Sequence, residues 1–130
     1  MDLWPNLDNV SKIETPKKIL EKQGQYLSDK TNAIVYAACE EALSEQEKGY
    51  EFKYRYYIAS KKMKNYRFML FTIYHNVTLY PLLIVVESQI AGEINLRKKS
   101  VVSKEEFEEA LRVIFRSKVI ESVIGTLINI

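Results

Sequence analysis

The sequence predicts an α+β domain built around an antiparallel sheet, and three observations carry this prediction. Three strand-like runs follow one another with connections too short for anything but antiparallel pairing, namely Tyr50–Ser60, Asn65–Asn76 and Leu79–Gln89. A further β-rich stretch precedes them, and helical patterns stand on both sides of the four. The expected architecture is an antiparallel meander of four strands, or of five, flanked by N- and C-terminal helices packed on the sheet, in the order α-β-β-β-β-α.

Length and composition indicate one ordinary domain. The chain has 130 residues, of which 47% are hydrophobic and 28% charged, so we expect an irregular lead-in over residues 1–14 and a single α+β domain over residues 15–130. The formal net charge of +2 is too small to imply nucleic acid or a membrane surface by itself. Cys39 is the only cysteine, no signal-like segment opens the chain, and no apolar run could span a bilayer, so we expect a cytoplasmic protein without membrane association.

The first helix is predicted to begin at Thr15-Pro16, because Thr is a good N-cap and Pro is favoured at the first helical position. Residues at helical spacing follow, namely Ile19, Leu20, Gln23, Tyr26 and Leu27. The stretch from Asn32 to Leu43 is predicted to be the first strand, although its alanines leave a continued helix open.

The middle strands differ in how many apolar faces they carry. Tyr50–Ser60 alternates between an apolar and a polar face, as a half-buried strand does. Asn65–Asn76 carries apolar residues on both faces, with Phe68 and Leu70 on one and Met69, Phe71 and Ile73 on the other. Such a strand belongs in the middle of a sheet with both faces covered. After the fourth strand, Leu79–Gln89, the connection has room for one more short strand around Ile94.

The C-terminal part is predicted to be helical. Ser103-Lys104-Glu105-Glu106 is a capping box, so a helix begins there. It presents one apolar stripe made of Phe107, Ala110, Leu111, Ile114 and Phe115. The helical pattern continues over Val119–Ile128 after a break.

If the terminal helices cover one face of the sheet, the apolar residues on the other face need a second cover. Either the C-terminal segment wraps round to that face or a second molecule packs on it. The second explanation is favoured slightly, and it predicts a homodimer with Met69, Phe71 and Ile73 as the candidate interface.

Basic residues form two clusters that a meander would place at one end of the sheet. Lys61, Lys62 and Lys64 occupy a turn, and Arg97, Lys98 and Lys99 follow the fourth strand. The acidic run of Glu40, Glu41, Glu45 and Glu47 is expected at the opposite end. Such polarity could attract nucleic acid, another polyanion or an acidic protein, although solvated turns are the commoner explanation.

Residues for chemistry are sparse. His75 is the only histidine, and no Cys, Asp or Glu stands near it at metal-ligand spacing. The neighbours of Cys39 are acidic, which disfavours a thiolate. The four glycines are scattered singly, so there is no phosphate-binding loop. We therefore predict no catalytic, cofactor-binding or metal-binding residue.

Several short motifs together resemble a family of small uncharacterised bacterial proteins. They are Pro16-Lys17-Lys18-Ile19-Leu20 with Gln23 and Thr31-Asn32, Asn65-Tyr66-Arg67 through Leu70-Phe71 and His75, Tyr80-Pro81, and the helix Ser103–Phe115. The likeness spans roughly Thr15 to Leu127 and implies a free-standing cytoplasmic domain, with no known activity or ligand attached to it.

The function expected from the sequence is binding without catalysis. The first hypothesis is a small protein-interaction or regulatory module that acts through an apolar and aromatic sheet face, as a homodimer and with a further protein partner. The alternative is a nucleic-acid or polyanion binder that uses the basic end, and an enzyme that uses His75 ranks third.

Overall fold

An antiparallel sheet of five strands forms the centre of the computed structural model, which describes residues 1–43 and 49–130. Its order, β1-β2-β3-β4-β5, follows the sequence as expected for a meander. The strands of the described chain are β1 (Val35–Ala42), β2 (Phe52–Ser60), β3 (Met63–His75), β4 (Leu82–Val86) and β5 (Lys98–Val101). The α+β class and the antiparallel meander predicted from the sequence are thus confirmed, with the fifth strand present.

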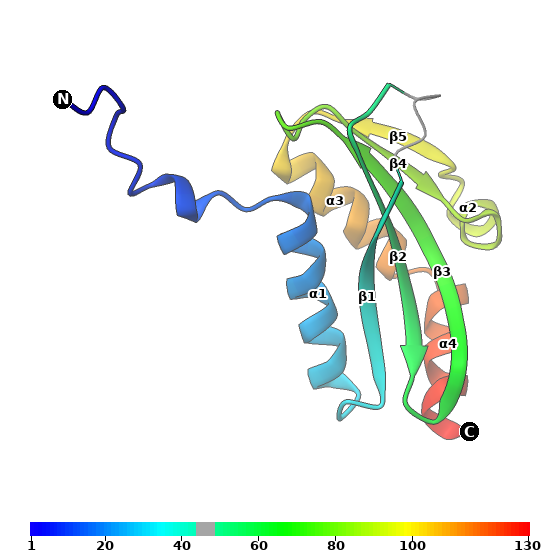
Figure 1. Ribbon diagram of the computed structural model, residues 1–130. Coiled ribbons are helices and arrows are strands. Elements are labelled where there is room, and N and C mark those ends of the chain that lie inside the picture. Colours follow the sequence, from blue (N-terminus) through cyan, green and yellow to red (C-terminus); the bar gives the residue numbers. More distant parts are fainter. Residues whose placement is uncertain (44–48) are drawn as a thin grey trace.

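Three helices cover one side of the curved sheet (Figure 1). They are α1 (Pro16–Lys30), α3 (Lys104–Phe115) and α4 (Lys118–Asn129). The Thr15 side chain caps α1 by accepting from the Lys18 amide at 3.3 Å, and the Ser103 side chain caps α3 by accepting from the Glu106 amide at 3.2 Å. Both helix starts and the break before the last helix are therefore confirmed.

The C-terminal helix does not wrap round the sheet. Figure 1 shows α4 on the same side as α1 and α3, where the Leu127 carbonyl accepts a hydrogen bond from the Ser60 hydroxyl at 3.5 Å. The first of the two expected ways to cover the opposite face is thus wrong.

The fifth strand lies four residues later than expected. Ile94 is the last residue of a short helix, α2 (Ser88–Ile94), which buries Ile90 and Ala91 and ends at Asn95 in the left-handed conformation (φ 54°). β5 then pairs with β4, and Val101 lies opposite Leu82. The helix was missed because seven residues after an apolar strand give too short a window for a helical period.

A β-bulge in β3 corrects the predicted interface. Tyr56 lies opposite Phe71 whereas Tyr57 lies opposite Met69, so Leu70 is an extra residue on β3. This residue breaks the alternation of side chains, and Leu70 and Phe71 are both fully buried, at 1% and 0% exposure. Phe71 and Ile73 therefore lie in the core under the helices, while Met69 lies on the opposite face. The three residues do not form one exposed surface.

The first 14 residues, which we call the N-terminal arm, extend away from the rest of the molecule (Figure 1). The arm contains one short 3-10 turn, η1 (Val10–Lys12), and none of the residues of that turn is buried. Glu14 joins the arm to the domain through an ion pair with Lys104 of α3 at 3.0 Å.

Candidate functional site

The two basic clusters lie far apart. β4 pairs only with the last part of β3, where Val85 lies opposite Thr72, and β5 pairs with β4, where Lys98 lies opposite Val85. At roughly 3.3 Å per residue, Thr72 is about 30 Å along β3 from Met63, which follows the basic turn. Lys61, Lys62 and Lys64 therefore do not meet Arg97, Lys98 and Lys99, which corrects the expected single basic end.

One lysine of the basic turn has a structural partner. The ammonium group of Lys62 donates to the carbonyl of Ile128 at 2.7 Å, near the end of α4. A cation beside the last carbonyls of a helix stabilises the helix. In the acidic run, Glu40 forms an ion pair with Arg67 at 2.8 Å; Glu45 and Glu47 lie outside the described residues.

His75 is buried among aromatic rings at the end of β3. Its side chain is 4% exposed and stacks on Phe52 and Tyr54, with ring centroids 5.2 and 5.8 Å away. Nδ1 lies 2.8 Å from the Asn76 carbonyl, and Nε2 has no hydrogen-bond partner among the described residues. Its burial and its stacking on two aromatic rings fit a core histidine.

A groove opens on the helical side of the sheet, between α1 and the pair α3 and α4. Its volume is about 490 Å³, within the range of ligand and peptide sites in proteins. The sheet and the inner helix faces line it with apolar side chains, including those of Ala37, Tyr56, Ile58, Leu70, Leu111, Phe115, Ile120 and Ile124. Polar and charged groups lie at the rim, including Gln23, Lys30, Glu108, Arg112 and Arg116. We call this site the interhelical groove.

The α1 wall of the interhelical groove is held close to the sheet by Gly24. A side chain at this position would place its Cβ 3.3 Å from the Ala37 carbonyl oxygen and 3.4 Å from the Tyr56 hydroxyl. Beside this close approach the Tyr56 hydroxyl donates to the Leu20 carbonyl at 2.9 Å. Burial raises the pKa of this hydroxyl well above its ordinary value. The hydroxyl therefore stays neutral and acts as a hydrogen-bond donor.

The opposite wall is fixed by one carboxylate. Glu93 of α2 accepts hydrogen bonds at the start of α4 from the Val119 amide at 2.8 Å, the Lys118 amide at 3.1 Å and the Ser117 hydroxyl at 3.1 Å. These bonds, first of all that of the Val119 amide, hold the pKa of Glu93 below its ordinary value. An anion at a helix N-terminus is stabilising, so the contact fixes the junction between α3 and α4. Both walls of the groove are thus anchored independently of any ligand.

The groove suits binding better than chemistry. Cys39 lies outside the groove lining, and burial raises the pKa of its thiol to about 12, which keeps the thiol neutral. In residues 1–43 and 49–130, no three His, Cys, Asp or Glu side chains gather in a way that could hold a metal ion. The side chains at the groove floor are aliphatic or aromatic, and such a surface favours apolar groups of a ligand.

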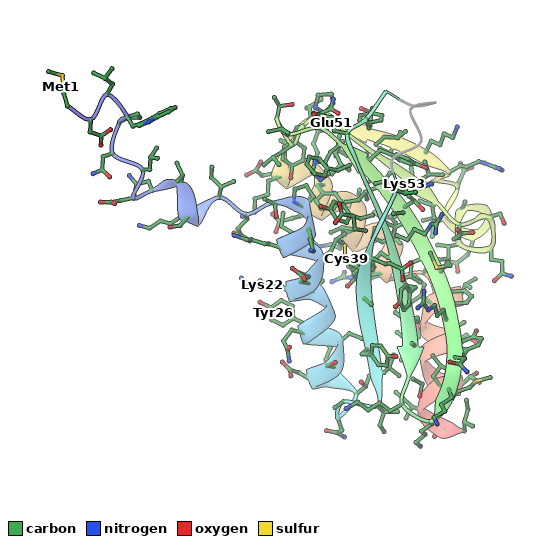
Figure 2. The ribbon with its side chains drawn as sticks, in the orientation of Figure 1. Met1, Lys22, Tyr26, Cys39, Glu51 and Lys53 are labelled. Carbon is green, nitrogen blue, oxygen red and sulfur yellow. The ribbon has the colours of Figure 1, made fainter. Side chains whose placement is uncertain are left out.

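Sequence patterns contain few signs of this groove. Its lining residues come from six elements, and several of them, such as Tyr26, Leu27 and Leu111, occupy positions that the helical pattern assigns to an apolar core face. The one signal in the sequence is the width of the apolar stripe on α1. This stripe includes Tyr26, which the core covers only in part, so that Tyr26 remains 46% exposed. Figure 2 shows Tyr26 on α1, one turn after Lys22.

Comparison with protein-family models, with curated proteins and with solved structures found no match to this chain. In the described part of the chain, no helix has the length and apolar character needed to cross a membrane.

Proposed function

We propose that this protein is a non-catalytic interaction module that binds an apolar protein segment in the interhelical groove. The observation that carries the proposal is an apolar groove of about 490 Å³. Hydrogen bonds within the domain hold both of its walls in place, so the groove is formed before any ligand binds. A preformed groove loses little conformational entropy on binding. Helices with one apolar face commonly bind in grooves of this kind.

The rim indicates which segments would be preferred. Lys30, Arg112 and Arg116 provide three cations there, against the carboxylate of Glu108. Arg112 forms an ion pair with Glu109 on the outer surface, so Lys30 and Arg116 are the more available cations. An apolar segment flanked by carboxylates therefore fits the groove better than one flanked by lysines.

The sheet face opposite the helices is a weaker candidate for the interaction. Its predicted anchors, Phe71 and Ile73, are buried in the core. The polyanion alternative also has less support, because its two basic clusters lie about 30 Å apart along the sheet. The interhelical groove, in contrast, is a concave apolar site of about 490 Å³.

Binding of anilinonaphthalene sulfonate tests the proposal. This probe joins apolar rings to one negative charge, so it matches the groove floor and the cationic rim. Tyr26 lines the groove, and its exposure of 46% makes Tyr26→Glu a surface change that folding should tolerate. A carboxylate at this position should weaken probe binding about tenfold, since an apolar contact is lost and the probe is repelled, together about 1.4 kcal/mol.

Tyr36→Glu is the matched control. Tyr36 has a similar exposure, 39%, and its side chain points to the opposite face of the sheet because the next residue, Ala37, lines the groove. This variant should bind the probe like the unchanged protein. Equal affinities for all three proteins, measured by fluorescence titration with circular dichroism as a check on folding, would contradict the proposal.

A further inference from the structure

The N-terminal arm exposes an unusual number of large apolar side chains. Leu3 and Trp4 are 86% and 80% exposed, and Leu7, Val10 and Ile13 are each just over half exposed. Figure 2 shows Met1 and the side chains of the arm clear of the rest of the molecule. Several large apolar side chains exposed together on one segment indicate an interaction site.

The arm matches the interhelical groove in pattern and in charge. Leu3, Leu7, Val10 and Ile13 recur every three or four residues, so a helical arm would present them as one stripe. Two carboxylates, Asp2 and Asp8, flank the first part of this stripe, and no lysine or arginine lies between them. The cations at the groove rim are complementary to these carboxylates.

The root of the arm directs it away from the groove of its own chain. Glu14 is held by Lys104 at 3.0 Å, and the next residue, Thr15, caps α1. The groove residues begin on α1 at Gln23, about two turns further along the helix, and on α3 at Glu108, one turn beyond Lys104. The arm would have to reverse its direction at Glu14 to bind along its own groove, whereas it already extends away from its own domain, where a second molecule can receive it once it is helical.

We propose that the N-terminal arm of one copy binds in the interhelical groove of a second copy. This inference rests on the proposed function of the groove and names its occupant. Reciprocal exchange uses both arms and both grooves, so the assembly closes as a dimer with twofold symmetry. Trp4 follows Leu3 directly, so it lies at the edge of the apolar stripe of the arm, where a large aromatic side chain adds to the contact with the groove.

The only tryptophan of the chain, Trp4, makes the test direct. Its emission should shift to shorter wavelength as the protein concentration rises, over the same range in which sedimentation equilibrium shows monomers becoming dimers. Leu7→Asp keeps Trp4 as the fluorescent reporter and removes one apolar contact of the arm, so it should weaken dimerisation at least tenfold. Tyr26→Glu should do the same from the groove side, while Tyr36→Glu should leave the dimer unchanged.

Three results would overturn the inference: a monomer at every concentration, a dimer whose Trp4 emission stays that of an exposed indole, or a blue shift that does not depend on concentration. The last result would mean that the arm binds its own chain. Binding of anilinonaphthalene sulfonate separates failure of the arm proposal from failure of the groove proposal. If the arm occupies the groove, Leu7→Asp should bind more of the dye than the unchanged protein. If only the arm proposal is wrong, Leu7→Asp has no effect on dye binding, whereas Tyr26→Glu still lowers it.

Discussion

Replacing Tyr56 with Phe isolates the hydrogen bond that ties the sheet to α1. The hydroxyl donates to the Leu20 carbonyl at 2.9 Å, and the two residues are 2% and 0% exposed. The variant keeps the ring, which stacks on Phe71 and lies 6.0 Å from Phe115. The change therefore removes one buried hydrogen bond and leaves the aromatic packing in place.

The expected loss of stability is about 1 kcal/mol, the usual net value of one neutral buried hydrogen bond. It is not larger because the Leu20 carbonyl lies within α1 and keeps its helical partner four residues on, so no buried acceptor loses its last hydrogen bond. For a domain of 130 residues this loss corresponds to a decrease in Tm of about 3–5 °C.

Urea denaturation followed by circular dichroism measures this loss. The control is Tyr57→Phe: Tyr57 points to the opposite face, lies under the Arg67 guanidinium at 4.5 Å and makes no hydrogen bond to another described residue through its hydroxyl. An unchanged midpoint for Tyr56→Phe, or an equal shift for both variants, would refute the reasoning.

The same variant has a pH signature. Burial raises the pKa of Tyr56 above its value of 10.0 in an unfolded chain, so its stabilising contribution is complete below about pH 10 and is lost as the pH rises toward the folded pKa. Tyr56→Phe should therefore lose less stability in alkali than the unchanged protein.

Three further predictions follow from the polar groups of the domain. The thiol of Cys39, with its pKa raised to about 12, should react with Ellman's reagent at pH 8 much more slowly in the folded protein than in urea, and equal rates would contradict its burial. Glu93→Gln should lower the urea midpoint at pH 7. The difference between the variant and the unchanged protein should shrink as the pH falls through the lowered pKa of Glu93 in the folded protein, because the protonated carboxyl no longer differs in charge from the amide. His75→Phe should change the free energy of unfolding by less than about 1 kcal/mol, since the lost Nδ1 contact is offset by removal of the unpartnered Nε2. His75→Ala also removes the ring and should lower the free energy of unfolding by about 3 kcal/mol. Similar losses for both variants would show that the ring nitrogens matter more than the packing of the ring.

Local chemical signals predicted most of the fold. Thr15-Pro16 and Ser103 mark helix starts through the hydrogen bonds of their side chains, and those signals need no tertiary information. The alternation in β2 predicts which face meets the helices, but the expectation of a half-buried strand is wrong, because Lys53 and Tyr57 on the other face are buried as well.

The errors arose where the pattern was locally ambiguous. A strand that is apolar on both faces looks the same with or without an extra residue, so the bulge at Leu70 could not be seen and Phe71 was placed on the wrong face. The order of strands in a meander places the two basic clusters at one end only if the strands have similar lengths, whereas β3 extends well beyond the end of β4. The interhelical groove depends on where α1 stands relative to α3, which no single element encodes.

The lysines of β5 acquire a different significance from their place in the sheet. β5 is an outer strand of four residues, and Lys98, Lys99 and Ser100 are all exposed. The backbone of an outer strand can pair with a strand of another molecule, which is the first step of many aggregates. A short outer strand that carries two charges is a poor template for such pairing. These residues thus help to keep concentrated protein in solution.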